Sequence, residues 1–197
     1  MKERIAIIGS GIAGIACSIR LAAKGYEVDC FEANDYPGGK LDTIETNGFR
    51  FDAGPSLFTM PNLLLECLEL AGKKHRDSFE YIKIDKACEY FYEDHTHLTA
   101  WSDKEKFSKE IKDKLGVKEE IVSNHLDHSR FLYETTHKIF LEKSLHKFKT
   151  YFSNEVLNAL HQIFKLGLNS SMHEINRTRL GNPKLIQLFD RFATYNG

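Results

Sequence analysis

The sequence predicts an α/β fold in which a β-α-β unit is followed by an α+β, mostly helical region. The first observation is an apolar run, Ile5–Ile8, that leads through a glycine-rich turn into a helical apolar pattern. The second is the helical spacing that dominates after residue 101. The third is composition, because 42% apolar and 28% charged residues in 197 are typical of a globular chain. We expect two domains, 1–78 and 79–197.

One β-α-β unit is predicted at the start of the sequence. The run Ile5–Ile8 is continuously apolar, as in a parallel strand that is covered on both faces. The helix that follows is expected to end at Lys24, with Gly25 as the residue that stops it. The second strand is expected at Tyr26–Phe31, directly before an acidic residue.

The turn of this unit carries the motif G-x-G-x-x-G, formed by Gly9, Gly11 and Gly14. The first glycine permits a tight turn, the second lets phosphate oxygens approach the backbone, and the third lets the helix pack closely. The helix N-terminus adds free N–H groups and the positive end of its dipole. Glu32 stands where a carboxylate accepts hydrogen bonds from a ribose and repels a 2′-phosphate. We therefore expect a Rossmann-like site for NAD or FAD rather than NADP.

A second glycine pair follows this unit. Gly38 and Gly39 let the chain pass close to a nucleotide, and the ammonium of Lys40 can offset phosphate charge. Taken alone, the same residues are explained by a plain turn at Pro37-Gly38.

The segment Ile5–Ser56 resembles the N-terminus of the flavin-dependent amine oxidase and phytoene desaturase superfamily. The run Asp52-Ala-Gly-Pro-Ser56 and the closing Leu188–Gly197 are similar to its phytoene (carotenoid) desaturase branch. The resemblance implies FAD as the cofactor and places the Asp-x-Gly-Pro-Ser run near the flavin. Lys40 stands where the superfamily more often has arginine, so a point charge replaces a bidentate contact. The residues expected to bind FAD are Gly9, Ser10, Gly11, Ile12, Ala13, Gly14, Glu32, Ala33, Gly38, Gly39, Lys40, Gly54, Pro55 and Ser56.

Members of that family are longer than this chain, and in them a C-terminal segment returns to the FAD domain. The resemblance therefore implies an N-terminal portion, with 1–78 belonging to the FAD domain and 79–197 to an incomplete substrate domain. A sheet that lacks a strand exposes an apolar edge, which favours aggregation or pairing with a complementary chain.

The remaining elements follow from turn and capping signals. A helix is expected at Pro61–Ala71, then strands at Tyr81–Ile84, Glu89–Tyr92 and His97–Trp101, of which the last two form a hairpin. Four further helices are expected: Ser102–Leu115 with a capping box of Ser102 and Glu105, Lys118 to about Lys143, Asn154–Leu166, and one capped by Asn182 with Pro183 in its first position.

The apolar faces of these helices are explained by helix-to-helix packing. The resemblance adds a second interpretation, a tunnel wall for a hydrophobic polyene substrate and a peripheral contact with a membrane. Residues 1–101 carry 11 basic and 16 acidic groups, and residues 102–197 carry 16 and 12. The basic surplus is compatible with anionic lipid, although a solvated surface explains it equally well. The net charge of −1 gives no reason to expect nucleic acid.

Other classes of site have weak support. The cysteines Cys17, Cys30, Cys67 and Cys88 show no C-x-x-C pair and are expected to be reduced and buried. The pairs His125/His128 and His95/His97 lack the acidic partners of a metal site, and no G-x-S-x-G motif is present. Asp190-Arg191 could orient a substrate or form an ion pair between helices. No catalytic residue is predicted.

The leading functional hypothesis is an FAD-dependent oxidoreductase that desaturates a carotenoid precursor by hydride transfer to the flavin. Carotenoid isomerases, oxygenases, retinol saturases and amine oxidase-like flavoproteins share these motifs and remain alternatives. The rival from another class is a truncated, non-catalytic fragment that binds FAD weakly. The uncharged run Ile5–Ile19 is short and broken by glycines, so the protein is expected in the cytoplasm, at most peripheral to a membrane.

Overall fold

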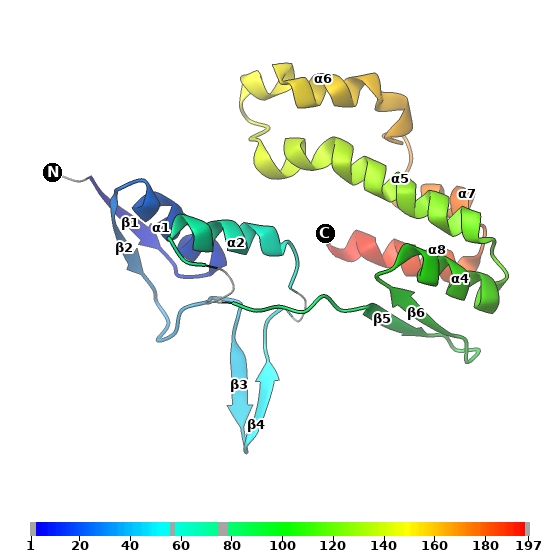
Figure 1. The fold of residues 1–197 in the computed structure, drawn as a ribbon, viewed down its shortest axis with the longest axis horizontal. Coiled ribbons are helices and arrows are strands. Elements are labelled where there is room, and N and C mark those ends of the chain that lie inside the picture. Colours follow the sequence, from blue (N-terminus) through cyan, green and yellow to red (C-terminus); the bar gives the residue numbers. More distant parts are fainter. Residues whose placement is uncertain (1–2, 56–57, 75–78, 196–197) are drawn as a thin grey trace. The chain divides into compact units, whose positions relative to one another are not determined.

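The computed structural model describes residues 3–55, 58–74 and 79–195, so Ser56, one of the predicted cofactor-binding residues, lies outside the described part. The chain divides into two compact units, Met1–Ile82 and Lys83–Gly197, which we call unit 1 and unit 2. Both are drawn in Figure 1, and the chain is a mixed α/β protein.

Unit 1 begins with the predicted β-α-β unit. Strand β1 (Arg4–Ile8), helix α1 (Ile12–Ala23) and strand β2 (Glu27–Phe31) follow one another, and the two strands pair in parallel. Helix α1 ends as predicted, because Lys24 is its last capping residue and Gly25 adopts a φ of +95°. This part of the expected fold is confirmed.

The expectation that the first strand is covered on both faces is wrong for the described residues. Ile5 and Ile7 are half-buried on the side of α1, whereas Ala6 and Ile8 are exposed, Ile8 by 83%. Only two strands form this sheet within the described ranges, and α1 covers one face of it. An apolar run therefore identified the strand correctly but not its surroundings.

A hairpin that was not predicted follows the second glycine pair. Strands β3 (Thr43–Thr46) and β4 (Phe49–Asp52) pair antiparallel around Asn47-Gly48, whose φ angles of +50° and +81° are those of a tight hairpin turn. Asn-Gly between two short strands is a strong hairpin signal, so the sequence did contain the information. Helix α2 (Pro61–Leu70) then forms where expected and packs against α1.

Unit 2 opens with the predicted hairpin of β5 (Lys86–Phe91) and β6 (His97–Trp101). The expected strand at Tyr81–Ile84 does not form: these described residues have no regular secondary structure, and Ile82 and Ile84 are 88% and 60% exposed. A strand needs a neighbour for its backbone groups, and the described residues offer this segment only the bond from the Ser102 hydroxyl to the Ile84 carbonyl.

The helices of unit 2 are α4 (Lys104–Leu115), α5 (Glu119–His137), α6 (Asn154–His161), α7 (Met172–Leu180) and α8 (Pro183–Asp190). Short π- or 3₁₀-helical turns lie at Lys138–Glu142, Phe148–Phe152, Ile163–Lys165 and Arg191–Tyr195.

Their caps confirm some predictions and correct others. Asn182 caps α8 as expected, because its side chain accepts hydrogen bonds from the backbone N–H groups at the start of that helix. The capping box assigned to Ser102 is wrong, since Asp103 is the capping residue of α4 and accepts a bond from the Lys106 N–H. Helix α7, with a complete capping box of Ser171 and Glu174, was not predicted.

Unit 2 contains the hydrophobic core. The buried side chains that pack together are Leu98, Phe107, Ile111, Val122, Leu180, Leu185, Leu188 and Phe189. The apolar face expected for α5 is only partly inside, because Val122 and His125 are buried whereas Tyr133 is 53% exposed. The four cysteines are free, as predicted, although Cys17 and Cys30 are exposed rather than buried. None of the described helices combines the length and the apolar character that crossing a membrane requires.

Candidate functional site

The glycine loop of unit 1 joins β1 to α1 through a turn that only glycine adopts easily. Gly9 has a φ of +97°, and its N–H donates to the carbonyl of Phe31 at 2.7 Å, which fixes the loop to the end of β2. Gly11 caps α1, and the first turn of this helix has neither an acidic residue nor a capping side chain. The first turn of α1, which includes Ile12 and Ala13, therefore presents N–H groups without a partner inside the helix, and such groups can bind an external anion.

Gly14 is required by the close approach of α1 to the loop. A Cβ atom at this position would lie 1.9 Å from the Gly9 carbonyl oxygen and 3.6 Å from Cγ2 of Ile7. By contrast, a Cβ atom on Gly11 would meet only the Cα of Gly39, at an ordinary 4.0 Å. The absence of a side chain at Gly14 serves the fold, whereas its absence at Gly11 leaves space at the helix N-terminus.

Glu32 ties the end of β2 to the glycine loop. Its Oε2 accepts hydrogen bonds from the Ser10 N–H at 2.7 Å and the Ser10 hydroxyl at 2.8 Å, and its Oε1 accepts from the N–H groups of Ala33 and Asn34. These bonds, with the Asn34 N–H first and the two Ser10 donors next, lower the pKa of Glu32 to about 2. The carboxylate is therefore ionised at neutral pH and held in one place.

The sequence analysis did not single out Asn34, although its side-chain amide also donates to Oε1 of Glu32, at 3.0 Å. The only signal for it in the sequence is that an asparagine lies two positions after the acidic residue at the end of β2. That pattern is common in turns, which explains why it carried no weight.

The second glycine pair lies directly against the first loop. The Gly38 N–H donates to the Ser10 carbonyl at 2.8 Å, and Gly11 and Gly38 form an isolated parallel bridge. Gly39 has a φ of +62°, and a Cβ atom there would lie 3.1 Å from the Cα of Gly11. Lys40 follows with an exposed side chain. Two glycine motifs that are far apart in the sequence thus form one backbone surface.

Gly54 joins the same group of segments. A Cβ atom there would lie 2.1 Å from the Lys40 carbonyl oxygen, so only glycine permits this contact. The neighbouring Ala53 N–H donates to the Asp42 carbonyl at 2.8 Å, and Pro55 continues the chain from this point. The structure therefore gathers the glycine loop, Glu32, the second glycine pair and Gly54, with Ser56 beyond the described residues.

The arrangement suits the binding of a phosphorylated dinucleotide. Free N–H groups at a helix N-terminus, glycines without side chains and a nearby ammonium are groups that bind a pyrophosphate. A carboxylate at the end of the second strand binds a ribose. Among the residues that the structure describes, no group of three or more His, Cys, Asp or Glu side chains is placed to hold a metal ion.

Asp190 and Arg191, in unit 2, make separate structural contacts. Asp190 accepts from His173 Nδ1 at 2.6 Å and from the Asn176 amide at 2.7 Å, which joins α8 to α7. Arg191 donates to the Tyr90 hydroxyl at 2.7 Å and so contacts β5. Both residues connect elements of unit 2.

Comparisons with known proteins agree with this geometry. Residues 7–66 match the family model of an NAD(P)-binding Rossmann-like domain. The whole chain is 50% identical to a 1-hydroxycarotenoid 3,4-desaturase from Flavobacterium sp. (strain P99-3) and covers 40% of that protein. It is 31% identical to a 4,4'-diapolycopene oxygenase from Methylomonas sp. and covers 39% of it. A third relative, a 4,4'-diapolycopen-4-al dehydrogenase from Metabacillus indicus, is 33% identical over 80% of this chain and 32% of its own length.

The chain thus spans about two fifths of the length of the first two of these relatives. The similarity to carotenoid desaturases that the motifs indicated is confirmed, and the matched domain indicates a dinucleotide cofactor.

Proposed function

We propose that this chain is part of an FAD-dependent oxidoreductase that desaturates a hydrophobic carotenoid precursor. The observation that carries the proposal is the 50% identity, over all 197 residues, to a 1-hydroxycarotenoid 3,4-desaturase. The glycine surface of unit 1 supports it independently, because its groups are those that bind a dinucleotide. Oxygenases and dehydrogenases among the relatives leave the final oxidation product open to experiment.

In this proposal the adenine end of FAD lies on the first glycine loop. The N–H groups of Ile12 and Ala13 and the backbone of Gly11 bind the pyrophosphate, and Lys40 offsets its charge. Glu32 binds the ribose, for which a ribose hydroxyl would replace the Ser10 hydroxyl on Oε2. The Ser10 N–H can keep its bond to the same oxygen, so the carboxylate stays in position.

The second glycine pair favours FAD over NAD. Gly38 and Gly39 extend the backbone surface beyond the first loop, and Gly54 continues it towards the expected flavin end. Once bound, a flavin supplies a two-electron acceptor for hydride. The contribution of this chain is to bind and orient, and we assign no acid or base to it.

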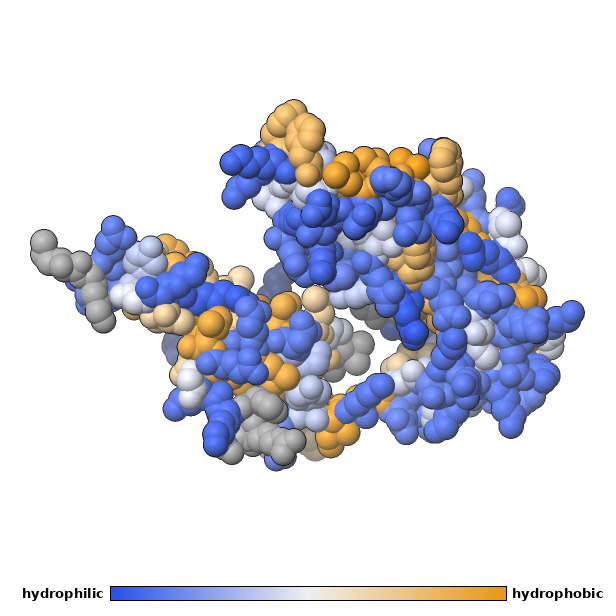
Figure 2. All heavy atoms as spheres, turned by 45° about the horizontal axis from the view of Figure 1, so that its top comes forward, coloured by the Kyte–Doolittle hydropathy of each residue, from blue (hydrophilic) through white to orange (hydrophobic). Residues whose placement is uncertain are grey.

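A peripheral contact with a membrane fits a lipid-soluble substrate. Residues 138–168 of unit 2 expose many large apolar side chains, and Figure 2 shows hydrophobic residues at the surface in its upper part. They are Phe140, Leu141, Leu145, Phe148, Tyr151, Phe152, Leu157, Leu160, Phe164 and Leu168. Lys147 and Lys149 lie among them, and cations beside apolar groups favour anionic lipid. Sedimentation with phosphatidylglycerol vesicles tests this contact.

A second candidate is a non-catalytic nucleotide-binding module that needs a complementary segment or chain. The open face of the β1–β2 sheet favours it, because Ile8 and Phe31 are 83% and 56% exposed. Purified protein with stoichiometric flavin, and a shift of polyene absorption to longer wavelength, would support the enzyme. Colourless protein that also leaves an added polyene unchanged would support the module.

The dinucleotide site is tested by titrating the chain with FAD and with NAD. We expect tighter binding of FAD, and Gly11→Ala should weaken it by about tenfold or more while the circular dichroism stays unchanged. The reason is that the new Cβ atom finds no close neighbour in the protein but occupies the space for the phosphates.

Glu32→Gln supplies the second test, with Glu45→Gln on strand β3 as the matched control. Loss of the carboxylate should weaken FAD binding, and the control should not. If Gly11→Ala and Glu32→Gln both bind FAD as well as the parent chain, the proposed site is wrong.

A further inference from the structure

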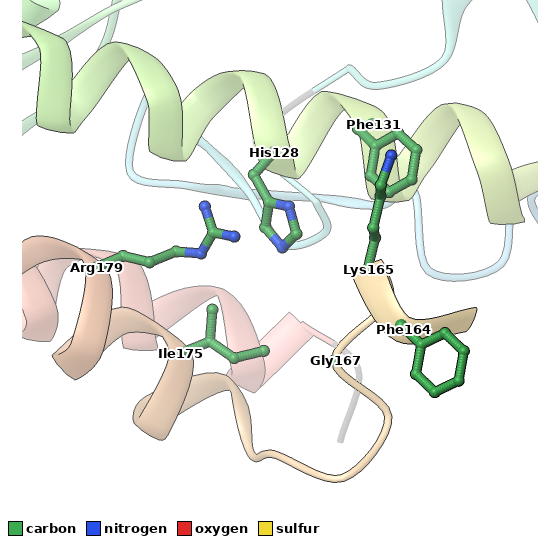
Figure 3. Close-up of a pocket in the computed structure, with 7 residues that line it drawn as sticks. All are labelled: His128, Phe131, Phe164, Lys165, Gly167, Ile175 and Arg179. Carbon is green, nitrogen blue, oxygen red and sulfur yellow. The ribbon is translucent and has the colours of Figure 1, made fainter. Parts of the chain in front are cut away.

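Unit 2 contains a recess that the dinucleotide site does not use. It has a volume of about 550 Å³ and lies between α5, the turn Ile163–Lys165 and α7 (Figure 3). Its lining residues are His128, Phe131, Phe164, Lys165, Gly167, Ile175 and Arg179. The lining contains three basic side chains and no acidic one.

Two of the basic groups face one another from opposite walls. Figure 3 shows the Arg179 guanidinium, on α7, and the His128 ring, on α5, pointing towards one another across the recess. Lys165 stands on the third wall, with its side chain beside Phe131. Within the described part of the chain, neither Arg179 nor Lys165 forms a hydrogen bond or an ion pair through its side chain.

The pKa of His128 also indicates that no carboxylate of the described residues lies close to its ring. Burial and then the positive charge of Arg179 lower the pKa of His128, and no carboxylate acts in the opposite direction. The Arg179 guanidinium faces this ring, and an anion between the two would pair with Arg179 and favour the protonated form of His128. The recess is therefore complementary to negative charge.

The rest of the lining is apolar. The Phe131 ring stacks near the His128 ring with centroids 6.2 Å apart, and Ile175 lies below them. Gly167 has a φ of +65°, and a Cβ atom there would come within 2.9 Å of Cδ1 of Ile175. Glycine at this position keeps the wall close to Ile175. At the rim, Phe164 points away from the other lining residues and is fully exposed.

We propose that this recess binds an amphiphilic oxyanion, with a phosphate or carboxylate head between Arg179 and His128. The apolar part of the ligand lies along Phe131 and Ile175. Arginine presents two parallel donors to such a head group, and charged hydrogen bonds in a partly enclosed site are strong. The proposal goes beyond the oxidoreductase function and does not depend on dinucleotide binding.

The head group could come from a lipid or from free phosphate, and calorimetric titration of the 197-residue chain distinguishes them. The probes are inorganic phosphate and dihexanoyl phosphatidic acid below its micelle concentration, so that no membrane surface is present. We expect both to bind, with the phosphatidic acid tighter because its chains contact the apolar lining. Equal binding of the two probes would overturn the assignment of the apolar wall, and no binding of either would overturn the whole proposal.

Two substitutions on one helix supply the matched comparison. Arg179→Gln should weaken binding of the phosphatidic acid by about tenfold or more. Arg177→Gln makes the same change of charge on α7 but lies outside the lining, and it should leave binding within about twofold. An equal loss in both variants would show a response to net charge and would overturn the site.

A spectroscopic measurement keeps the test independent of affinity. The ring protons of His128, assigned by their loss in His128→Gln, report its pKa by proton NMR. Saturating phosphatidic acid should raise that pKa, because an anion beside the ring favours its protonated form. An unchanged His128 pKa with ligand bound would place the ligand elsewhere.

Discussion

The two units of this chain are stabilised in different ways. In unit 1 the buried residues within the described ranges are Ser10 and Cys67, and glycine contacts and backbone hydrogen bonds shape the site. Unit 2 buries a connected apolar cluster that includes Leu98, Ile111 and Leu185. A dinucleotide loop can therefore be recognised from a few residues, whereas the packing of unit 2 depends on contacts far apart in the sequence.

The largest expected effect is on the core of unit 2. Leu185 is fully buried on α8, so Leu185→Ala should lower the free energy of unfolding by about 3 kcal/mol through lost burial and the cavity left behind. Ile8→Ala, on the exposed face of β1, is the matched aliphatic truncation in unit 1 and should cost less than about 0.5 kcal/mol. Urea unfolding followed by circular dichroism measures both. Equal costs would mean that Ile8 is covered in solution and that the contrast between the units is wrong.

The next effect concerns a buried histidine of unit 2. His125 is 4% exposed, packs edge-on against Phe189 at 4.5 Å and has a buried Nδ1 without a partner among the described residues. Burial first, and then the charges of Arg179 and His128, lower its pKa from 6.5 to about 4.

A base whose pKa is lowered on folding takes up fewer protons in the folded state than in the unfolded state. Stability from neutral His125 is therefore complete above pH 6.5 and is lost as the pH falls towards 4. We expect a loss of about 2.5 kcal/mol over this range in urea unfolding. His125→Phe should remove much of it, and His161→Gln, on the exposed surface of α6, should leave it in place. An identical pH dependence in His125→Phe would show that other groups cause it.

In unit 1 the matching case is an acid, Glu32, whose lowered pKa reflects stabilisation of the charged form rather than the neutral form. Its pKa is lowered to about 2, so its contribution to stability is complete above pH 4.5 and is lost progressively as the pH falls from 4.5 through about 2. Carbon-13 NMR of the carboxyl group should show this late titration. In Ser10→Ala the pKa should rise part of the way towards 4.5, because one donor to the carboxylate is removed. A Glu32 that titrates near 4.5 in the parent chain would mean that the loop is open in solution.

Sequence patterns predicted the local features of both units but not their surroundings. The strand Ile5–Ile8, the stop at Gly25 and the cap at Asn182 follow from residues within one or two turns of each other, and all three are confirmed. The burial of Ile8 and the strand expected at Tyr81–Ile84 depend on neighbours distant in the sequence, and both were predicted incorrectly. The contact of Gly38 with Gly11 is of the same long-range kind, and only the structure brings the two motifs together.

The smallest expected effect is on the ion pair between α1 and α2 in unit 1. Arg20 on α1 donates two hydrogen bonds to Glu66 on α2, at 2.7 and 2.9 Å, and this contact lowers the pKa of Glu66. Both side chains are 40% or more exposed, so solvent and salt screen the attraction, and such pairs contribute little to stability. Glu66→Gln should therefore leave the melting temperature within experimental error, in low salt and in high salt alike. A clear drop in melting temperature at low salt that disappears at high salt would show that the ion pair between α1 and α2 stabilises unit 1. Polar contacts would then stabilise unit 1, as the buried apolar cluster stabilises unit 2.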